Sequence, residues 1–402
     1  MSILILNRVP YSKCPYDKWL NLLNDDIILF TSEETYPDYK DKFNKVIPFK
    51  DYQKNGNVER IALELHKEYQ FQTIIAISEL DLLRAAQIRE YLKLDGQSYN
   101  SALAFRNKML MKKTIKKSDD VDIPKFQEIN STLDILKFIE QNGYPVVIKP
   151  ICGSGSINTT VLKDSEELEL FISNNTFIDL MIEEYIDGDM YHIDGLIVDN
   201  DVIFSWPSKY VNGCLAFQTG NYLGSYILDE KNPMNKRLKL VCQNVLSQFP
   251  LPSYTTFHLE VFHTKDDKIY FCEVASRTGG ARVNEVLNYS FNLDITKLWI
   301  QSQCGLLDSK LIQQSYTINQ YTGWLLIPPK KGELCNIPMG IPPEYIIDYK
   351  LNGKIGSSFS EATISVDHIA SFLVKGETEQ DLKSNLQKSA EWFDKHTKWL
   401  IK

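Results

Sequence analysis

The sequence predicts a mixed architecture, with an N-terminal α/β domain followed by α+β domains. Its 402 residues exceed what a single hydrophobic core usually serves. The first hundred residues alternate short apolar strands with helical patterns, whereas residues 257–274 show an antiparallel hairpin pattern. With 43% hydrophobic and 24% charged residues, the composition is that of ordinary globular protein. We therefore expect two or three domains.

The first predicted domain spans residues 1–104. Its strands and helices alternate as in βαβ units, which favours a small parallel sheet of Rossmann type. No GxGxxG motif opens a helix here, so the dinucleotide-binding fingerprint is absent and this domain indicates no function by itself. The predicted strands are Ile3–Leu6, Ile27–Phe30 and Thr73–Ile77, and the predicted helices are Val58–Tyr69 and Leu80–Tyr91.

A basic helix over Ala104–Lys117 carries Lys108 and begins the second region. Beyond a helix over Leu133–Gln141, an apolar strand ends at Lys149, where a charge is costly unless it has a partner. The glycine loop, Gly153-Ser154-Gly155-Ser156, connects this strand to the next one. The loop opens no helix and is therefore not a Walker A motif. The backbone N–H groups of such a hairpin tip can still fold over phosphates as a flap.

A predicted β-hairpin brings two glutamates together. If its turn centres on Asp266-Asp267, cross-strand partners have residue numbers that sum to 533. Opposed side chains have Cβ atoms about 4.5–5.5 Å apart, and like charges there call for a cation or a shifted pKa. Hard divalent ions prefer carboxylate oxygens, so the pair predicts Mg²⁺ carrying a nucleotide; the alternative is a solvated sheet face. The predicted pairs are Glu260–Glu273, Val261–Cys272 and His263–Tyr270.

The remaining segments complete the predicted order of elements. Leu180–Val198 predicts a strand, a turn at Asp187-Gly188 and a second strand. Alternation with period 2 places Met190, His192 and Asp194 on one face of that second strand. The later elements are a strand over Ile203–Val211, a helix over Pro233–Phe249, a β-rich stretch beyond Gly305 and a charged helix over Glu377–Lys398.

Charge, cysteines and histidines exclude several classes of function. The net charge of −8 gives no electrostatic case for nucleic acid or an anionic membrane. No apolar run reaches the roughly 18 residues of a membrane-spanning helix. The seven scattered cysteines contain no CxxC pair and the six histidines show no ligand spacing, which argues against a disulfide framework and a zinc site. The first ten residues are too short and wrongly flanked for a signal peptide, so we expect a cytoplasmic protein.

Taken in order, these features resemble the ATP-grasp superfamily. The order and spacing of the parts carry the resemblance, which covers essentially the whole chain. It implies a Rossmann-like preATP-grasp domain over 1–104 and an ATP-grasp domain over 105–310. The latter would divide into an A lobe of about 105–185 and a B lobe of about 186–310. Residues 311–402 would form a β-rich region similar to the lid end of biotin-carboxylase-like members.

The resemblance also implies roles for individual residues. In this family the matching lysines hold phosphates, the glycine loop covers them, and the hinge after the A lobe binds adenine, mainly through the backbone. The paired glutamates hold Mg²⁺ or Mn²⁺, and an arginine after them faces the phosphoryl and acyl oxygens. The corresponding residues are Lys108 and Lys149, Gly153, Ser154, Gly155 and Ser156, Glu183, Glu184, Tyr185 and Ile186, Glu260 and Glu273, and Arg277.

Three further residues are candidates on the same resemblance. Lys209, in Ser-Lys-Tyr, is similar to the lysine of D-alanine–D-alanine ligases that reaches the γ-phosphate, and Asp194 is counted with the nucleotide-binding residues. His258 lies two residues before Glu260 and is expected to orient the substrate or stabilise charge. The competing interpretations are a solvated Lys209, a core histidine at His258, and a structural ion pair of Arg277 with a neighbouring carboxylate such as Glu285.

The HLE…EVASR pattern is similar to that of L-amino-acid ligases. It implies an ATP-dependent carboxylate–amine ligase that forms an acyl phosphate and releases ADP and phosphate. Its partners would be small carboxylates and amines, amino acids among them, and a homodimer is compatible with the sequence. The departures Asn107, Met190 and Ala275 leave open an inactive nucleotide-binding regulator. A biotin-carboxylase-like enzyme and a ligase acting on a carrier protein are also compatible with the sequence.

Overall fold

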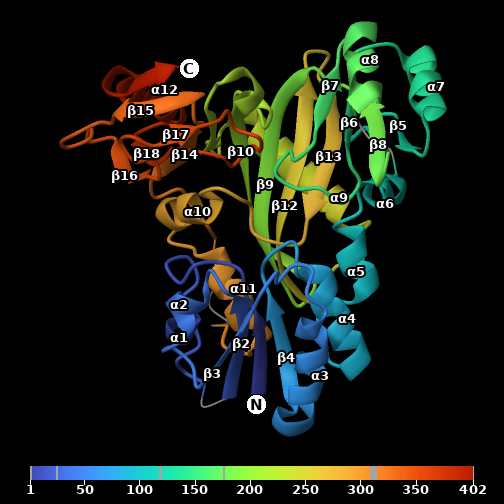
Figure 1. Cartoon of the computed structure of the whole chain (residues 1–402), viewed down its shortest axis with the longest axis vertical. Helices are drawn as coiled ribbons and strands as arrows, with labels where there is room; N and C mark the ends of the chain where they lie inside the picture. Colours follow the sequence, from blue (N-terminus) through green and yellow to red (C-terminus); the bar gives the residue numbers. More distant parts are fainter. Residues whose placement is uncertain (1, 24–25, 117–119, 175–176, 308–314, 402) are drawn as a thin grey trace.

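The computed structural model describes residues 2–23, 26–116, 120–174, 177–307 and 315–401. Its N-terminal part is a four-stranded parallel sheet in the order β3-β2-β1-β4, which confirms the predicted Rossmann-like architecture (Figure 1). No helix within the described ranges is long and apolar enough to cross a membrane. The elements of this part are β1 (Ser2–Leu6), α1 (Tyr16–Trp19), β2 (Asp26–Ser32), α2 (Tyr36–Tyr39), β3 (Lys45–Phe49), α3 (Asn57–Tyr69), β4 (Phe71–Ala76) and α4 (Leu82–Leu92).

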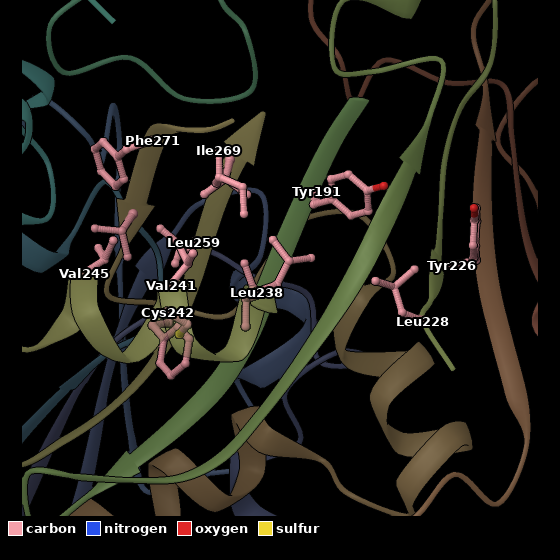
Figure 2. Packing of buried hydrophobic residues seen from close by; sticks show 14 of the residues in the cluster. Tyr191, Tyr226, Leu228, Leu238, Val241, Cys242, Val245, Leu259, Ile269 and Phe271 are labelled. Carbon is pink, nitrogen blue, oxygen red and sulfur yellow. The ribbon is translucent and has the colours of Figure 1, made fainter. Parts of the chain in front are cut away.

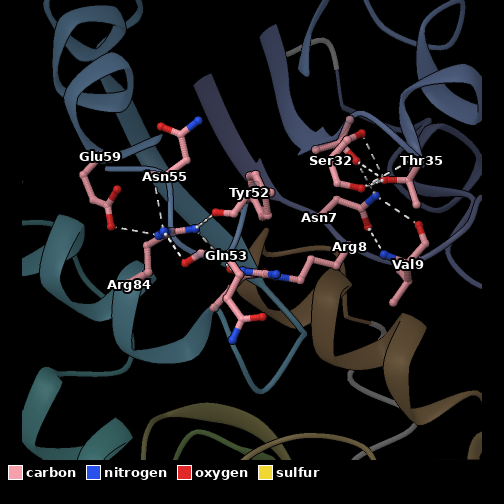
Figure 3. A network of polar contacts seen from close by, with 12 residues as sticks. Asn7, Arg8, Val9, Ser32, Thr35, Tyr52, Gln53, Asn55, Glu59 and Arg84 are labelled. Atoms are coloured by element: carbon pink, nitrogen blue, oxygen red, sulfur yellow. Dashed lines mark hydrogen bonds and ion pairs between the residues drawn. The ribbon is translucent and has the colours of Figure 1, made fainter. Parts of the chain in front are cut away.

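Alternation along β1 assigns its side chains to the two faces of this sheet. Leu4 and Leu6 pack with residues of α3 and α4, whereas Ile3 and Ile5 pack with Ile300 of helix α11 (Ile295–Gln303). Beyond the carboxyl ends of the strands, Arg84 donates hydrogen bonds to the carbonyl oxygens of Tyr52 and Gln53 and pairs with Glu59 (Figure 3). These contacts fasten the loop after β3 to the helices.

The A lobe is a four-stranded antiparallel sheet in the order β5-β8-β6-β7, with helices packed against it. The predicted basic helix is two helices, because the chain leaves helical conformation between Phe105 and Asn107. The Asn107 side chain then caps the second helix by accepting a hydrogen bond from the Leu110 N–H, and Lys117 lies outside the described residues. The elements are α5 (Tyr99–Ala104), α6 (Lys108–Thr114), β5 (Phe126–Ile129), α7 (Thr132–Asn142), β6 (Val146–Pro150), β7 (Thr160–Leu162), α8 (Ser165–Asn174) and β8 (Leu180–Glu184).

An eight-stranded sheet forms the centre of the molecule, in the order β13-β12-β9-β10-β11-β14-β18-β16. Its last three strands come from the predicted C-terminal region, which therefore extends the B-lobe sheet. The expected boundary at 310 falls within 308–314, outside the described residues. The remaining elements are β9 (Gly188–Val198), β10 (Asp201–Val211), η1 (Ala216–Thr219), β11 (Leu223–Ile227), α9 (Pro233–Leu246), β12 (Tyr254–Thr264), β13 (Ile269–Ala275), α10 (Val283–Phe291), β14 (Tyr321–Ile327), β15 (Gly332–Asn336), β16 (Ile346–Leu351), β17 (Ser358–Phe359), β18 (Ala370–Gly376), α12 (Glu379–His396) and β19 (Lys398–Ile401).

Helices cover both faces of this sheet. On one face, Leu238, Val241 and Val245 of α9 point at Leu259 and Phe271 of the β12–β13 hairpin (Figure 2). On the other face, residues of α10 and α11 pack against the same strands. The β12–β13 hairpin is therefore packed on both of its faces.

The predicted hairpin is present, with one change in register. Glu260 lies opposite Glu273, as predicted, and His258 lies opposite Ala275. The other two predicted pairs are wrong, because Val261 lies opposite Phe271 and His263 lies opposite Ile269. The register shifts between Glu260 and Val261, so one extra residue, Cys272, sits in β13 as in a β-bulge.

Candidate active site

A cavity of about 390 Å³ lies where the A lobe, the eight-stranded sheet and the C-terminal region meet. Its lining includes every predicted site residue except Lys209 and Asp194. Ser365 and Val366 of the C-terminal region also line it, although no sequence motif predicted their involvement. Residues from distant parts of the chain therefore share one site.

Two lysines enter the cavity from the A lobe. Lys108, at the start of α6, pairs with Glu273 Oε2 at 2.9 Å and donates to the Gly153 carbonyl oxygen at 2.7 Å. Lys149, at the end of β6, pairs with Glu183 Oε1 at 2.5 Å. Burial alone would lower the pKa of Lys149, but the charge of Glu183 outweighs it and raises that pKa. Both lysines therefore present positive charge to the cavity.

Glu183 begins the hinge segment that crosses from β8 to β9. Its Oε2 atom lies 3.1 Å from Lys112 Nζ, yet it accepts no hydrogen bond from the residues that the structure describes. Glu184, Tyr185 and Ile186 follow it along the cavity wall. A carboxylate acceptor followed by the hinge backbone along one cavity wall fits the amino group and ring edge of an adenine.

The glycine loop closes over one side of the cavity. Gly155 has φ of +61°, a conformation that glycine adopts without strain, and its carbonyl oxygen accepts a hydrogen bond from the Ser365 N–H at 3.1 Å. Arg106 donates to the Cys152 carbonyl oxygen at 2.8 Å, just before the loop. The loop is thus held both by the A lobe and by the C-terminal region.

Glu260 and Glu273 face the cavity from adjacent strands. Glu260 Oε1 accepts a hydrogen bond from the Tyr210 hydroxyl at 2.7 Å and lies 3.2 Å from His258 Nε2. Burial alone would raise the pKa of Glu273, but Lys108 outweighs it, with help from Lys149 and Arg277, and lowers that pKa to about 2. Each carboxylate uses one oxygen in these contacts and has a second oxygen for another ligand. Two carboxylates on neighbouring strands fit a hard divalent cation such as Mg²⁺.

A buried chain of hydrogen bonds runs behind Glu260. Ser225 contacts His192 Nε2 at 2.6 Å, His192 Nδ1 contacts Asp194 at 2.5 Å, and Asp194 contacts His258 Nδ1 at 2.8 Å. His192, Asp194 and His258 lie close enough together to hold a metal. The ring nitrogens of both histidines already have hydrogen-bond partners, however. Burial alone would lower the pKa of His258, but Asp194 outweighs it and raises it to about 10.

The expectation that Asp194 binds the nucleotide needs correction. Its side chain is fully buried and lies outside the cavity lining, because it points at the two imidazoles. Gly279 packs against this contact, where an added Cβ would lie 2.6 Å from Asp194 Oδ1. Asp194 therefore orients His258, which itself lines the cavity.

Arg277 lies in the cavity wall beyond the hairpin and pairs with the N-terminal domain. Its Nε atom donates to Glu79 Oε2 at 2.7 Å, and Glu79 also pairs with Arg106. The competing expectation, a structural ion pair of Arg277 with a neighbouring carboxylate, is met by Glu79; the partner named for it, Glu285, is wrong because Glu285 pairs with Arg282. Burial alone would raise the pKa of Glu79, but the two arginines outweigh it and lower that pKa.

The γ-phosphate role expected for Lys209 is not supported by its position. Lys209 pairs with Asp189 at 2.6 Å and lies 5.4 Å from the centre of the Tyr191 ring. Side chains alternate along β10, so the adjacent Tyr210 enters the cavity while Lys209 lies on the opposite face. Tyr210 is the residue of this pair that contacts Glu260.

Several residues at or beside the site were not among the candidates predicted from the sequence. Lys112 follows Lys108 by one helical turn, and that spacing is the signal that could have found it. Tyr210 follows Lys209 directly and needed only the correct assignment of strand faces. Glu79 and Ser365 leave no local signal, because the partners of each lie in another part of the fold.

The three departures from the family pattern have separate explanations. Asn107 caps α6 through its side chain. Met190 lines the cavity and adds apolar surface to it. Ala275 lies opposite His258, with its small side chain buried in the sheet.

Comparison with known proteins gives a consistent result. Residues 105–281 match the family model of the ATP-grasp domain. The L-arginine-specific L-amino acid ligase of Bacillus subtilis is 26% identical over 290 residues, which cover 69% of this chain and 68% of that protein. The L-amino acid ligase of Bacillus licheniformis has a TM-score of 0.78 at 17% identity, over 100% of this chain and 98% of its own.

A second solved structure shares the fold across nearly the full length. The carboxyaminoimidazole ribonucleotide synthase of Aspergillus clavatus has a TM-score of 0.73 at 15% identity, over 98% of each chain. The family match spans the A lobe, the hinge and the β12–β13 hairpin, which supply most of the residues that line the cavity. Residues 105–281 are therefore an ATP-grasp domain, in a chain that is similar to an L-amino acid ligase over 69% of its length.

Proposed function

We propose that this ATP-dependent carboxylate–amine ligase joins two amino acids through an acyl phosphate and releases ADP and phosphate. One observation carries the proposal: Lys108, Lys149 and Arg277 converge with the Glu260–Glu273 pair on a single cavity. Phosphoryl transfer asks mainly for positioning and charge neutralisation, and this set of charges supplies both.

The nucleotide would lie with its adenine at the hinge and its phosphates under the glycine loop. The carboxylate of Glu183 would accept a hydrogen bond from the adenine amino group, and the backbone of Glu184 and Ile186 would bind the ring edge. Lys108 and Lys149 would contact the phosphates as compact point charges. Glu260 and Glu273 would hold Mg²⁺, which neutralises charge on the phosphates when it is bound.

At the far end of the phosphates, Arg277 would meet the acyl group. Its guanidinium can grip two oxygens of a planar oxyanion at once, and Glu79 fixes its orientation from the N-terminal domain. His258 faces the same end of the cavity, where its positive charge would stabilise the developing carboxyl-phosphate oxygens. No covalent attachment to the protein is required.

The assignment of amino acids as substrates rests on the relatives. The similar protein from Bacillus subtilis is a ligase specific for L-arginine, and the similar structure from Bacillus licheniformis is an L-amino acid ligase. The identity of about one quarter does not extend the arginine preference to this chain. We therefore propose free L-amino acids as the substrate class for both positions.

A product assay tests the proposal. The enzyme is incubated with ATP, Mg²⁺ and pairs of L-amino acids, and phosphate, pyrophosphate and dipeptides are measured by enzymatic assay and mass spectrometry. We expect ADP and phosphate in equal amounts with a dipeptide. Stoichiometric pyrophosphate would contradict the γ-phosphoryl mechanism. Phosphate release that depends on bicarbonate would indicate carboxylation instead of amino-acid ligation. Phosphate release that depends on a carrier protein would indicate aminoacylation of that carrier.

A further inference from the structure

Lys112 is a fully buried lysine directly behind the cavity. Its side chain has 0% exposure and lies one helical turn after Lys108 on α6. The ammonium lies 3.1 Å from Glu183 Oε2, donates to the Cys272 carbonyl oxygen at 3.0 Å, and lies 5.4 Å from the centre of the Phe271 ring. Lys112 does not line the cavity. Because burying a charged ammonium costs free energy, its presence here calls for an explanation.

The charges around Glu183 explain the buried ammonium of Lys112. Glu183 lies between Lys112 and Lys149, which pair with different oxygens of its carboxylate. The three charges sum to plus one. Without Lys112, the carboxylate of Glu183 would neutralise Lys149 alone, and the net charge of this Glu183–Lys149 pair would be zero.

We infer that Lys112 is a positioning residue for nucleotide binding, which shares Glu183 and so leaves the ammonium of Lys149 able to attract phosphate. This inference rests on the proposed phosphate role of Lys149. Lys112 does not touch the nucleotide, because Glu183 and β13 separate it from the cavity. We therefore expect a larger effect on ligands that carry phosphates than on adenosine, which would meet Glu183 but not Lys149.

A purely structural role makes a different prediction. Lys112 also joins α6 to β13 through the Cys272 carbonyl oxygen, and that contact alone would explain its burial. Loss of such a contact would weaken the site for every ligand and would not depend on the charge of Glu183. The two accounts separate when Lys112 and Glu183 are changed singly and together.

The test compares wild type, Lys112→Met, Glu183→Gln and the double variant. Calorimetry gives the affinities for Mg²⁺-ADP and for adenosine, which has no phosphates. We expect Lys112→Met to weaken Mg²⁺-ADP roughly tenfold, in the range of neighbouring charges that couple, and to change adenosine affinity less than about threefold. In the Glu183→Gln background, the same substitution should change Mg²⁺-ADP affinity by less than about threefold, because the competing carboxylate is gone.

Controls keep the result specific. Lys113→Met removes an exposed lysine from the same helix and should leave both affinities unchanged. Should Lys112→Met fail to fold, Lys112→Gln keeps a donor for the Cys272 carbonyl oxygen and takes its place. Equal losses for Mg²⁺-ADP and adenosine, or losses that simply add in the double variant, would overturn the inference. A wild-type protein that binds no Mg²⁺-ADP would overturn the proposed nucleotide site itself.

Discussion

Each cation of the proposed phosphate site pairs with a carboxylate on another element. Lys108 pairs with Glu273, Lys149 with Glu183, and Arg277 with Glu79. These pairs keep the long side chains in one arrangement, at the cost of lower positive charge in the cavity. A divalent cation at Glu273 would compensate for the release of Lys108 toward a phosphate, so metal and nucleotide should bind together.

Glu273→Gln tests the role of the acidic pair. Glutamine keeps the shape of the side chain but removes the charge that would hold Mg²⁺ opposite Glu260. We expect turnover to fall by roughly 10²-fold or more while ATP affinity changes only several-fold, since the metal acts mainly in the transition state. Single-turnover phosphate release and calorimetry give the two quantities, with Glu285→Gln as the control outside the cavity. Near-normal turnover at saturating Mg²⁺ would refute the metal assignment.

Arg277→Lys tests the role of the guanidinium. An ammonium can still pair with Glu79 but cannot grip two oxygens at once. We expect ATP affinity within a few-fold of wild type and a ligation rate lower by roughly 10²-fold, the scale of losing one preorganised donor. Melting temperature and single-turnover rate are measured together, with Arg282→Lys as the matched control. A lower melting temperature with an unchanged rate would assign Arg277 a structural role only.

At the scale of elements, local patterns in the sequence predicted the glutamate hairpin and the glycine loop. The alternation around the turn placed Glu260 opposite Glu273, and the glycines marked the loop after Lys149. The bulge at Cys272 was not predictable, because a strand with one extra residue has the same residue types as a regular strand. Period-2 alternation separated Lys209 from Tyr210 but could not say which one faces the cavity. That choice depends on how the sheet packs against the rest of the fold.

Nucleotide binding should slow amide hydrogen exchange in the glycine loop and in the segment around Ser365 together. Gly155 bonds to Ser365, and the loop has few side chains of its own to pack. We expect amide hydrogen exchange over 152–158 and over 363–368 to slow together when a non-hydrolysable ATP analogue binds. Exchange over α12, which packs on the sheet through Leu382 and Leu386, serves as the internal control. Equal exchange of both segments with and without the analogue would mean that the loop is a fixed turn.

At the scale of the whole molecule, four parts of the chain meet at the cavity. The N-terminal domain contributes Glu79 behind Arg277, and the A lobe contributes Lys108 and Lys149. The eight-stranded sheet carries the acidic pair, and the C-terminal region closes over the glycine loop. Ion pairs are among the contacts between these parts at the cavity, and the strength of these pairs should depend on pH.

The acid sensitivity of folding tests this dependence. Glu79, Glu183 and Glu273 have lowered pKa values, because nearby cations outweigh the effect of burial. In an unfolded chain a glutamate has a pKa of about 4.3. Each of these groups therefore stabilises the folded state above that pH, and this stabilisation is lost as the pH falls through the lower pKa of the folded state. Each adds a slope of up to about 1.4 kcal/mol per pH unit to the free energy of unfolding, and we expect a steep loss between about pH 4 and pH 2.

The expected slope can be assigned to the buried glutamates with one pair of variants. Glu273→Gln removes a group whose pKa is lowered to about 2, so the acid-induced fall in the urea midpoint should be shallower than in wild type. Glu361→Gln removes an exposed carboxylate of the C-terminal region and should leave the slope unchanged. Because the cavity pairs join separate parts of the chain, loss of the slope in Glu273→Gln would show that the active-site charges also hold those parts together. Identical slopes in the two variants would mean that acid unfolds the protein through other groups.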